Sequence, residues 1–228
     1  MATRFYFPST GTPGISPAFG SWDVTSNADR REMVRTRISS AMTNKDGSGD
    51  ATVGNHLLRQ YVSSESLAAQ TLSGTIKGQV RIQNVGGGNV GSLAVRVAKC
   101  ASDGSGVTEI LIISYSTDAS GVPPRPDTTM TNRRFEQGDN DFALDLTSTA
   151  IDAGDRLIVE LGYRDTSTNT SRYCRHSLGD DSATDLAEDE TTTTADNPWI
   201  EFSADIAFAA AGGSGGDRNQ ALMLRGVG

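Results

Sequence analysis

The feature that most constrains the fold is a strict alternation of side chains between residues 72 and 82. Every second position there is apolar or glycine: Leu72, Gly74, Ile76, Gly78, Val80 and Ile82. A period of two gives a strand one apolar and one polar face, as in a half-buried antiparallel sheet. Two of the apolar-face positions are glycines, which predicts either a bulge or a close approach by a bulky side chain from the facing sheet.

Further strand patterns follow at short intervals, and clusters of Gly, Pro, Asn and Asp such as Asp103–Gly106 separate them. These patterns cover residues 92–100, 108–115, 142–146, 155–164, 172–178 and 199–208. Repeated short strands with such turns predict an all-β fold, and we expect one antiparallel β-sandwich. Residues 27–42 fit a helical stripe about as well as an alternating strand, so both alternatives stay open there.

The two ends of the chain differ from its middle. Residues 1–20 contain a run rich in Pro, Gly and Ser and predict an extended N-terminal arm, whereas residues 21–208 form the sandwich domain. Residues 209–228 are Gly-rich and predict a C-terminal tail that is flexible or bound by a partner. We expect the arm and tail to pack on neighbouring subunits through Arg4, Phe5, Tyr6, Phe7, Leu222, Met223 and Leu224.

The charge balance argues against a nucleic-acid partner. With 28 acidic and 20 basic side chains, the net charge is −8, which repels polyphosphate. Four arginines do gather at Arg30, Arg31, Arg35 and Arg37, but no aromatic residue lies among them to stack on bases; they could pair with acidic groups of a neighbouring subunit. Since no apolar run suits a signal peptide or a membrane helix, we expect synthesis in the cytoplasm and no membrane partner.

Three motifs suggest ligands, and each has a simpler interpretation. Gly86–Gly91 matches G-x-G-x-x-G, but a strand pattern follows where a dinucleotide site needs a helix, so we interpret it as a hairpin turn. Residues 44–50 resemble half of a calcium loop, yet the neutral Asn55 stands where the bidentate acid belongs. The acidic residues of 180–190 are a better cation candidate by charge, although such runs are usually solvated. No cofactor is predicted, and calcium binding is left open.

The sequence offers little for catalysis. It has two histidines, His56 and His176, no G-x-S-x-G motif, and two cysteines, Cys100 and Cys174, outside any CxxC pair. We expect both cysteines to be buried, with their pairing open. We therefore predict that the chain is not an enzyme and has no catalytic or metal-binding residues; a glycoside hydrolase would need two carboxylates facing one cleft.

Several stretches resemble structural proteins encoded by tailed bacteriophages and environmental viruses. They are Ala2–Ser9, Ser16–Phe19 with Trp22, Leu57–Ser63, Gln70–Gln79, Ala153–Glu160, Leu178–Asp180 and Asp196–Phe202. The resemblance covers most of the chain up to Ser203 and carries no catalytic residues.

The resemblance implies a virion-associated protein of jelly-roll type, either a capsid decoration protein or a tail component. Its expected partners are major capsid or tail proteins and further copies of itself, and its expected location is the virion. The competing hypothesis is a carbohydrate-binding or host-receptor-binding module that holds a surface glycan on Trp22 and Trp199.

Overall fold

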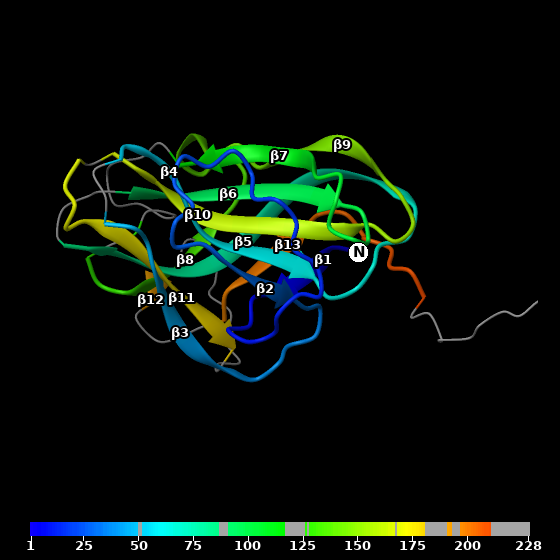
Figure 1. The fold of residues 1–228 in the computed structure, drawn as a ribbon, viewed down its shortest axis with the longest axis horizontal. Helices are drawn as coiled ribbons and strands as arrows, with labels where there is room; N and C mark the ends of the chain where they lie inside the picture. The colour runs from blue at the N-terminus through cyan, green and yellow to red at the C-terminus, as the bar shows by residue number, and fades with distance from the viewer. Residues whose placement is uncertain are drawn as a thin grey trace, which may run out of the picture.

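A computed structural model describes most of the chain, and its two β-sheets pack face to face (Figure 1). The described residues are 1–49, 52–86, 91–116, 126, 128–166, 168–180, 191–192 and 197–210. Within these ranges the only helical element is a single 3-10 turn, η1 (Asp139–Asp141), and all other regular structure is β-strand. The all-β prediction is confirmed.

The first sheet has eight strands. They are β1 (Thr3–Tyr6), β3 (Ser40–Asp46), β5 (Gln70–Val85), β8 (Thr131–Phe135), β9 (Asp145–Ile151), β11 (Tyr173–Asp180), β12 (Thr191–Thr192) and β13 (Trp199–Phe202). The second sheet has five strands in the order β2-β4-β10-β6-β7. They are β2 (Asp29–Met33), β4 (Gly54–Ser63), β6 (Gly91–Cys100), β7 (Thr108–Tyr115) and β10 (Arg156–Asp165).

Strand β5 organises the first sheet because it is 16 residues long and pairs along both edges. The registers place β13 and β11 one after the other on one edge, and β9 and β8 on the other. The predicted bulge is confirmed at Gly74, whereas the bulky side chain at Gly78 comes from the neighbouring strand β8 and not from the facing sheet. A Cβ on Gly78 would lie 2.4 Å from the Phe135 ring, and Gly74 lies at a bulge with a φ of +106°.

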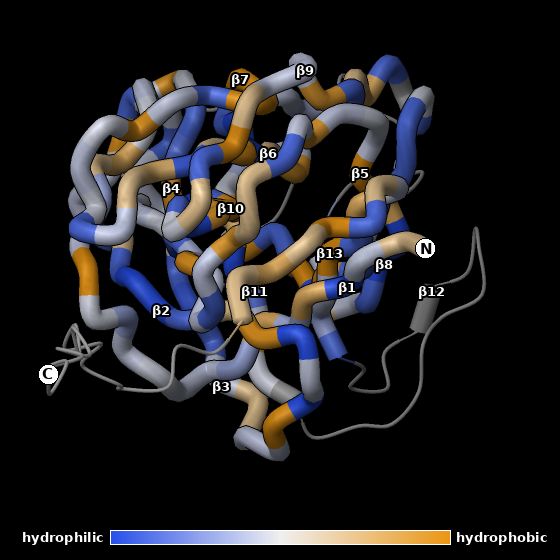
Figure 2. Tube along the Cα trace, turned by 90° about the vertical axis from the view of Figure 1, so that its right-hand side faces the viewer, coloured by the Kyte–Doolittle hydropathy of each residue, from blue (hydrophilic) through white to orange (hydrophobic). Residues whose placement is uncertain are grey.

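The two sheets enclose one principal hydrophobic core. It takes alternate residues from β5, β6 and β10, which appear in Figure 2 as strands that mix hydrophobic and hydrophilic positions. The sheets are also joined at one edge, where Tyr6 of β1 forms an antiparallel bridge with Val34, directly after β2. Burial of alternate side chains from both sheets is what the period of two predicted.

The expected N-terminal arm is wrong for the first residues. Thr3–Tyr6 pairs with Phe202–Trp199 as an edge strand of the chain's own sheet, and Phe5 and Phe7 are fully buried in its core. The alternation of Phe5 and Phe7 with Arg4 and Tyr6 is a strand pattern, so these rings fill the sandwich and are not available to a neighbouring subunit.

Residues 27–42 contain two strand segments and no helix. In β2 the side chains of Asp29, Arg31 and Met33 face inward, since Met33 belongs to the core and the strand alternates. Strand β2 runs parallel to β4, whereas every other pair of named strands in the described part is antiparallel. The expectation of a purely antiparallel sandwich is therefore corrected at this edge.

The predicted hairpin at Gly86–Gly91 is also wrong. A strand, β6, does follow the glycines, as expected, but β5 and β6 belong to different sheets. The connection therefore crosses from one sheet to the other, and residues 87–90 within it lie outside the described part.

A buried carboxylate holds the segment that contains Gly20 and Trp22 against the outer face of the second sheet. Glu160 of β10 accepts hydrogen bonds from Trp22 Nε1 at 2.6 Å, Gln60 Nε2 at 2.8 Å, Arg96 Nη1 at 2.9 Å and the Gly20 backbone N–H at 3.2 Å. All of these donors converge on a side chain that is 0% exposed. Such convergence is what a buried charge requires.

The Glu160 cluster predicts a large loss of stability when its charge is removed. In Glu160→Gln the Arg96 guanidinium, 2% exposed, loses its buried partner. We expect the free energy of unfolding in urea to fall by about 3–5 kcal/mol. The matched control is Glu109→Gln, which removes the other Arg96 partner at a site 37% exposed and should cost less than about 1 kcal/mol. Equal losses in the two variants would contradict this account.

Candidate binding site

A hollow of about 360 Å³ opens on the outer face of the first sheet. It is lined by Ala2, Thr75, Ile76, Lys77, Glu136, Gln137, Glu201 and Ser203. Strand alternation explains the set, because Ile76 of β5 turns into the core while its neighbours Thr75 and Lys77 turn outward. The residues after β8 supply Glu136 and Gln137, so four separate segments of chain meet here.

The charges in this hollow are paired across strands. Glu201 of β13 stands opposite Arg4 on one side and Lys77 on the other. Its Oε2 accepts from Arg4 Nε at 3.0 Å and Nη2 at 2.9 Å, and its Oε1 lies 3.7 Å from Lys77 Nζ. The Lys77 contact, at 3.7 Å, is an ion pair that is longer than a hydrogen bond.

The opposite wall is held in place by its own hydrogen bonds. Gln137 Nε2 donates to Asp145 Oδ2 at 2.9 Å, and Gln137 Oε1 accepts from the backbone N–H of Leu144. Ser203 Oγ accepts from the Thr75 backbone N–H at 2.9 Å. The hollow thus has two carboxylates, an ammonium and two hydroxyls in its lining, and hydrogen bonds fix part of its wall.

A second polar cluster lies where the edge strands β2 and β3 of the two sheets approach each other, and we call it the mouth. Its members are Asp29, Arg31, Lys45, Arg59, Tyr61 and His176. Registers explain the gathering: Asp29 pairs with Arg59 and Arg31 with Tyr61 in one sheet, and Lys45 pairs with His176 in the other. Each pair shares a face of its sheet, and both faces point inward.

One carboxylate serves three cations in the mouth. Asp29 accepts from Arg59 Nε at 2.7 Å and Nη2 at 3.1 Å, and it lies 3.5 Å from Arg31 Nη2 and 3.8 Å from Lys45 Nζ. Desolvation lowers the pKa of Lys45, and the charges of Arg59 and Arg31 lower it further against the opposing effect of Asp29. The cluster is therefore short of negative charge.

The deepest groups of the mouth are fully buried. Desolvation raises the pKa of Tyr61 to about 12, although the nearby Arg59 acts against this shift. Desolvation, together with the charge of Arg59, lowers the pKa of His176 to about 3, so this imidazole is neutral at ordinary pH.

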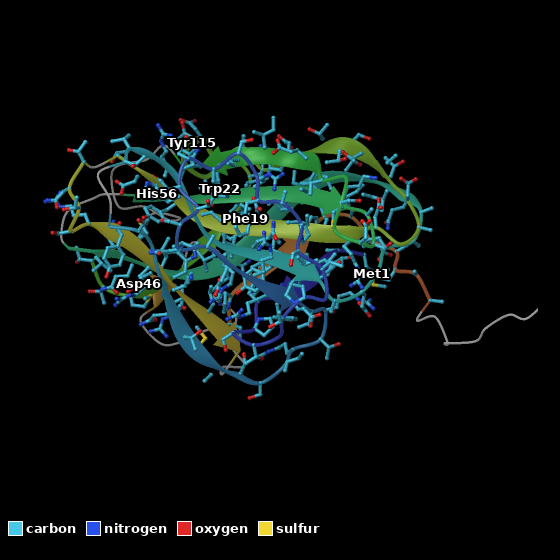
Figure 3. All side chains as sticks on the ribbon, viewed as in Figure 1. Met1, Phe19, Trp22, Asp46, His56 and Tyr115 are labelled. Carbon is cyan, nitrogen blue, oxygen red and sulfur yellow. The ribbon has the colours of Figure 1, made fainter. Side chains whose placement is uncertain are left out.

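The two tryptophans predicted to hold a glycan are both buried. Trp22 packs with Phe19 and Tyr115 over the outer face of the second sheet (Figure 3), and its indole N–H is used by Glu160. Trp199 is 0% exposed and lies beneath the guanidinium groups of Arg4 and Arg134, at 3.8 Å and 4.6 Å from its ring centroid. Neither ring presents a face to solvent, so the predicted stacking role is corrected.

Among the predicted assembly residues, only Arg4 borders the hollow, through its pair with Glu201. Tyr6 is half-buried, and Leu222, Met223 and Leu224 lie outside the described residues. Sequence reasoning missed Lys77, Glu136 and Glu201. Lys77 was assigned correctly to the polar face of its strand, but only strand order brings it beside Glu201.

The described residues contain no group of three or more His, Cys, Asp or Glu side chains that could hold a metal ion. Asn44 and Asp46, part of the calcium-like run, lie within strand β3, and Asp46 pairs with Arg175. The acidic residues 181–190 are outside the described part. Cys100 and Cys174 are buried, as predicted, and form no disulfide; Cys174 Sγ donates to Asn84 Oδ1 at 3.2 Å. No helix among the described residues is long and apolar enough to cross a membrane.

Comparison with known proteins gives distant structural likenesses only. No protein-family model and no curated protein sequence matches the chain. A CocE/NonD family hydrolase from Staphylococcus aureus matches 92% of the chain at 10% identity with a TM-score of 0.44. An aminopeptidase from a Thaumarchaeota archaeon matches 92% at 9% identity with a TM-score of 0.38, and an α-amino acid ester hydrolase matches 91% at 6% identity with a TM-score of 0.35.

The chain spans only 36–37% of the length of these three proteins. All three are hydrolases, and this finding overturns the prediction that the chain is not an enzyme. The likenesses assign no activity of their own to this chain. The hollow does bring two carboxylates, Glu136 and Glu201, to one cleft, which is the arrangement that the hydrolase alternative required.

The buried His176 predicts a specific acid sensitivity. Its pKa is about 3 in the fold and about 6.5 in an unfolded chain, so the unfolded state binds more protons between these values. Stability should therefore fall as the pH drops from about 6.5 towards 3, by up to about 1.4 kcal/mol per pH unit from this group. Urea unfolding of wild type and His176→Gln across this range tests it. The free energy of unfolding should depend less steeply on pH in His176→Gln, by the one proton that His176 takes up on unfolding. Parallel curves for the two proteins would contradict the low pKa of His176.

Proposed function

We propose that the chain is an accessory structural protein of a tailed-phage particle, built as a jelly-roll sandwich and attached through its C-terminal tail to capsid or tail proteins. The resemblance of Ala2–Ser9 and of Asp196–Phe202 to phage-encoded proteins supports the particle, and the closed two-sheet body supports a structural role. This body buries Phe5 and Phe7 near the N-terminus, so we assign the attachment to the tail.

The observation that carries the proposal is where the tail begins. The Ile206 N–H donates to Thr3 Oγ1 at 2.8 Å, the Ala209 N–H donates to the Ser66 carbonyl at 2.9 Å, and Arg35 covers the Phe208 ring at 3.9 Å. The chain is thus fixed to the body up to residue 209, at the end where Met1 also lies (Figure 1). A tail that starts from a fixed point at one end can bind a neighbour while the rest of the sandwich faces away.

Removal of residues 211–228 tests the attachment. The truncated chain keeps every described strand, so we expect an unchanged urea midpoint but loss of most co-sedimentation with particles assembled without the chain. A triple variant, Leu222→Ser, Met223→Ser and Leu224→Ser, should lose binding as the truncation does if the apolar tip makes the contact. Full binding by the truncated chain would remove the tail from the proposal.

The second candidate function is carbohydrate binding, and the hollow on the first sheet favours it. Its side chains carry balanced charge, with Glu136 and Glu201 against Lys77 and Arg4, so it favours neither a cation nor an anion. Sugar hydroxyls can donate to the carboxylates and accept from the ammonium in the same complex. We therefore place the glycan in this hollow, and not on Trp22 or Trp199.

Glycan-array screening followed by calorimetry tests the second candidate. Glu136→Gln and Lys77→Met should each weaken binding of a captured glycan by about tenfold or more, because each removes a charge-assisted hydrogen bond. Glu109→Gln, a partly exposed carboxylate on the other sheet, serves as the control and should bind normally. Absence of any captured glycan, or unchanged binding by both hollow variants, would exclude this function.

A further inference from the structure

We propose that the mouth between β2 and β3 is an anion-binding site that takes a small oxyanion, either a carboxylate or a phosphate group. It is separate from the hollow, which lies on the outer face of the first sheet, and it goes beyond the attachment role proposed above. Three independent features of the mouth support it: its charge, its unpaired donors and its exposed rim.

The first feature is an excess of positive charge in an acidic protein. Arg31, Lys45 and Arg59 converge on one carboxylate, Asp29. The nearby Asp46 is paired with Arg175 and also acts on Lys45, so counting this pair still leaves four cations, with Arg175, against the two carboxylates Asp29 and Asp46. The whole chain carries a net charge of −8, and three cations around one acid therefore mark a local site that attracts anions.

The second feature is a set of buried polar atoms that lack a hydrogen bond among the described residues. They are both ring nitrogens of His176, together with Arg59 Nη1 and Tyr61 Oη, whose side chains also interact with each other. Asp29 accepts hydrogen bonds from Nε and Nη2 of Arg59, so Nη1 of Arg59 takes no part in this ion pair. Buried polar groups are nearly always paired, and a cluster of unpaired ones indicates a bound water, ion or ligand group.

These atoms suit an oxyanion in particular. A guanidinium N–H, a phenol O–H and the single N–H of the neutral His176 ring are donors, and Tyr61 keeps its proton because its pKa is raised to about 12. A metal cation would be repelled by the arginines, and an apolar group would leave the donors unpaired. Carboxylates and phosphates offer several acceptor oxygens that can reach a buried arginine and a rim lysine together.

The third feature is access from solvent. The rim side chains are partly exposed, at 30% for Arg31, 29% for Asp29 and 19% for Lys45, whereas Arg59 at the floor is 5% exposed. The exposure therefore falls from the rim side chains to Arg59, and the rim cations are the groups that an anion in solvent meets first. Arg31 is fixed at the rim, because its Nε donates to the Ser9 carbonyl at 3.1 Å and its Nη1 to the Arg30 carbonyl at 2.7 Å, whereas Lys45 is held only by its 3.8 Å contact with Asp29.

Thermal unfolding with inorganic phosphate, acetate and chloride at equal ionic strength tests the proposal on the full chain. Phosphate or acetate should raise Tm saturably, by about 3–5 °C at ten times the dissociation constant, and chloride should have a smaller effect. A response to acetate alone assigns the site to carboxylates, and a response to phosphate alone assigns it to phosphate groups. Equal shifts with all three salts would overturn the oxyanion site, as would no shift with any of them.

Two lysine variants locate the effect. Lys45→Met keeps the length of the side chain and removes a cation from the rim, so the Tm shift should fall by at least half while the protein without added anion stays folded. Lys77→Met is the matched control, since Lys77 is also paired loosely with a carboxylate but lies in the hollow, and it should keep the full shift. Equal shifts in Lys45→Met and wild type would place the anion elsewhere and reject the mouth as the site.

Discussion

The arrangement of the second sheet depends on how one carboxylate is removed from water. Glu160 has no exposure, and a buried charge is tolerated only when hydrogen bonds replace its hydration. Those bonds come from Gln60 and Arg96 on the two flanking strands and from Gly20 and Trp22 in the segment above. The buried charge of Glu160 therefore links three strands of the sheet to the outer segment and fixes the position of Trp22.

Two glycines leave room for the side chains of this cluster. A Cβ on Gly20 would lie 2.4 Å from Arg96 Nε, and one on Gly162 would lie 2.6 Å from the Trp22 ring. Strand β4 also carries a bulge opposite Leu161 and Gly162, which lets it pair with β10 on both sides of the cluster. The other two polar sites pair their charges differently. The hollow has equal numbers of cations and carboxylates at the protein surface, whereas the mouth holds more cations than carboxylates.

Sequence patterns predicted the strands whose two faces differ clearly. Strands β5, β6 and β10 alternate in the ordinary way, and the two glycines of β5 indicated its close contacts. Strand β4 was not assigned, because His56, Arg59 and Gln60 are polar and yet buried, so they hide the apolar period. The hollow and the mouth could not be predicted from the sequence. Lys77 meets Glu201 only because strands more than a hundred residues apart pair, and Lys45 meets Asp29 only because the two sheets pack together. The prediction for the tryptophans was wrong because the sequence around a tryptophan at a loop-to-strand junction is the same whether the ring faces solvent or the core.

The short contact of residues 207–209 with Ser66 to Ala68 has a mechanical meaning. A pull on the chain beyond residue 210 acts first on the Ala209 and Ala207 backbone hydrogen bonds, which lie outside the named strands. These bonds can open one at a time and release a few residues of slack before the load reaches β13, whose Ile200 and Phe202 are buried in the core. A body tethered at this point could take up small displacements of its support without exposing hydrophobic surface.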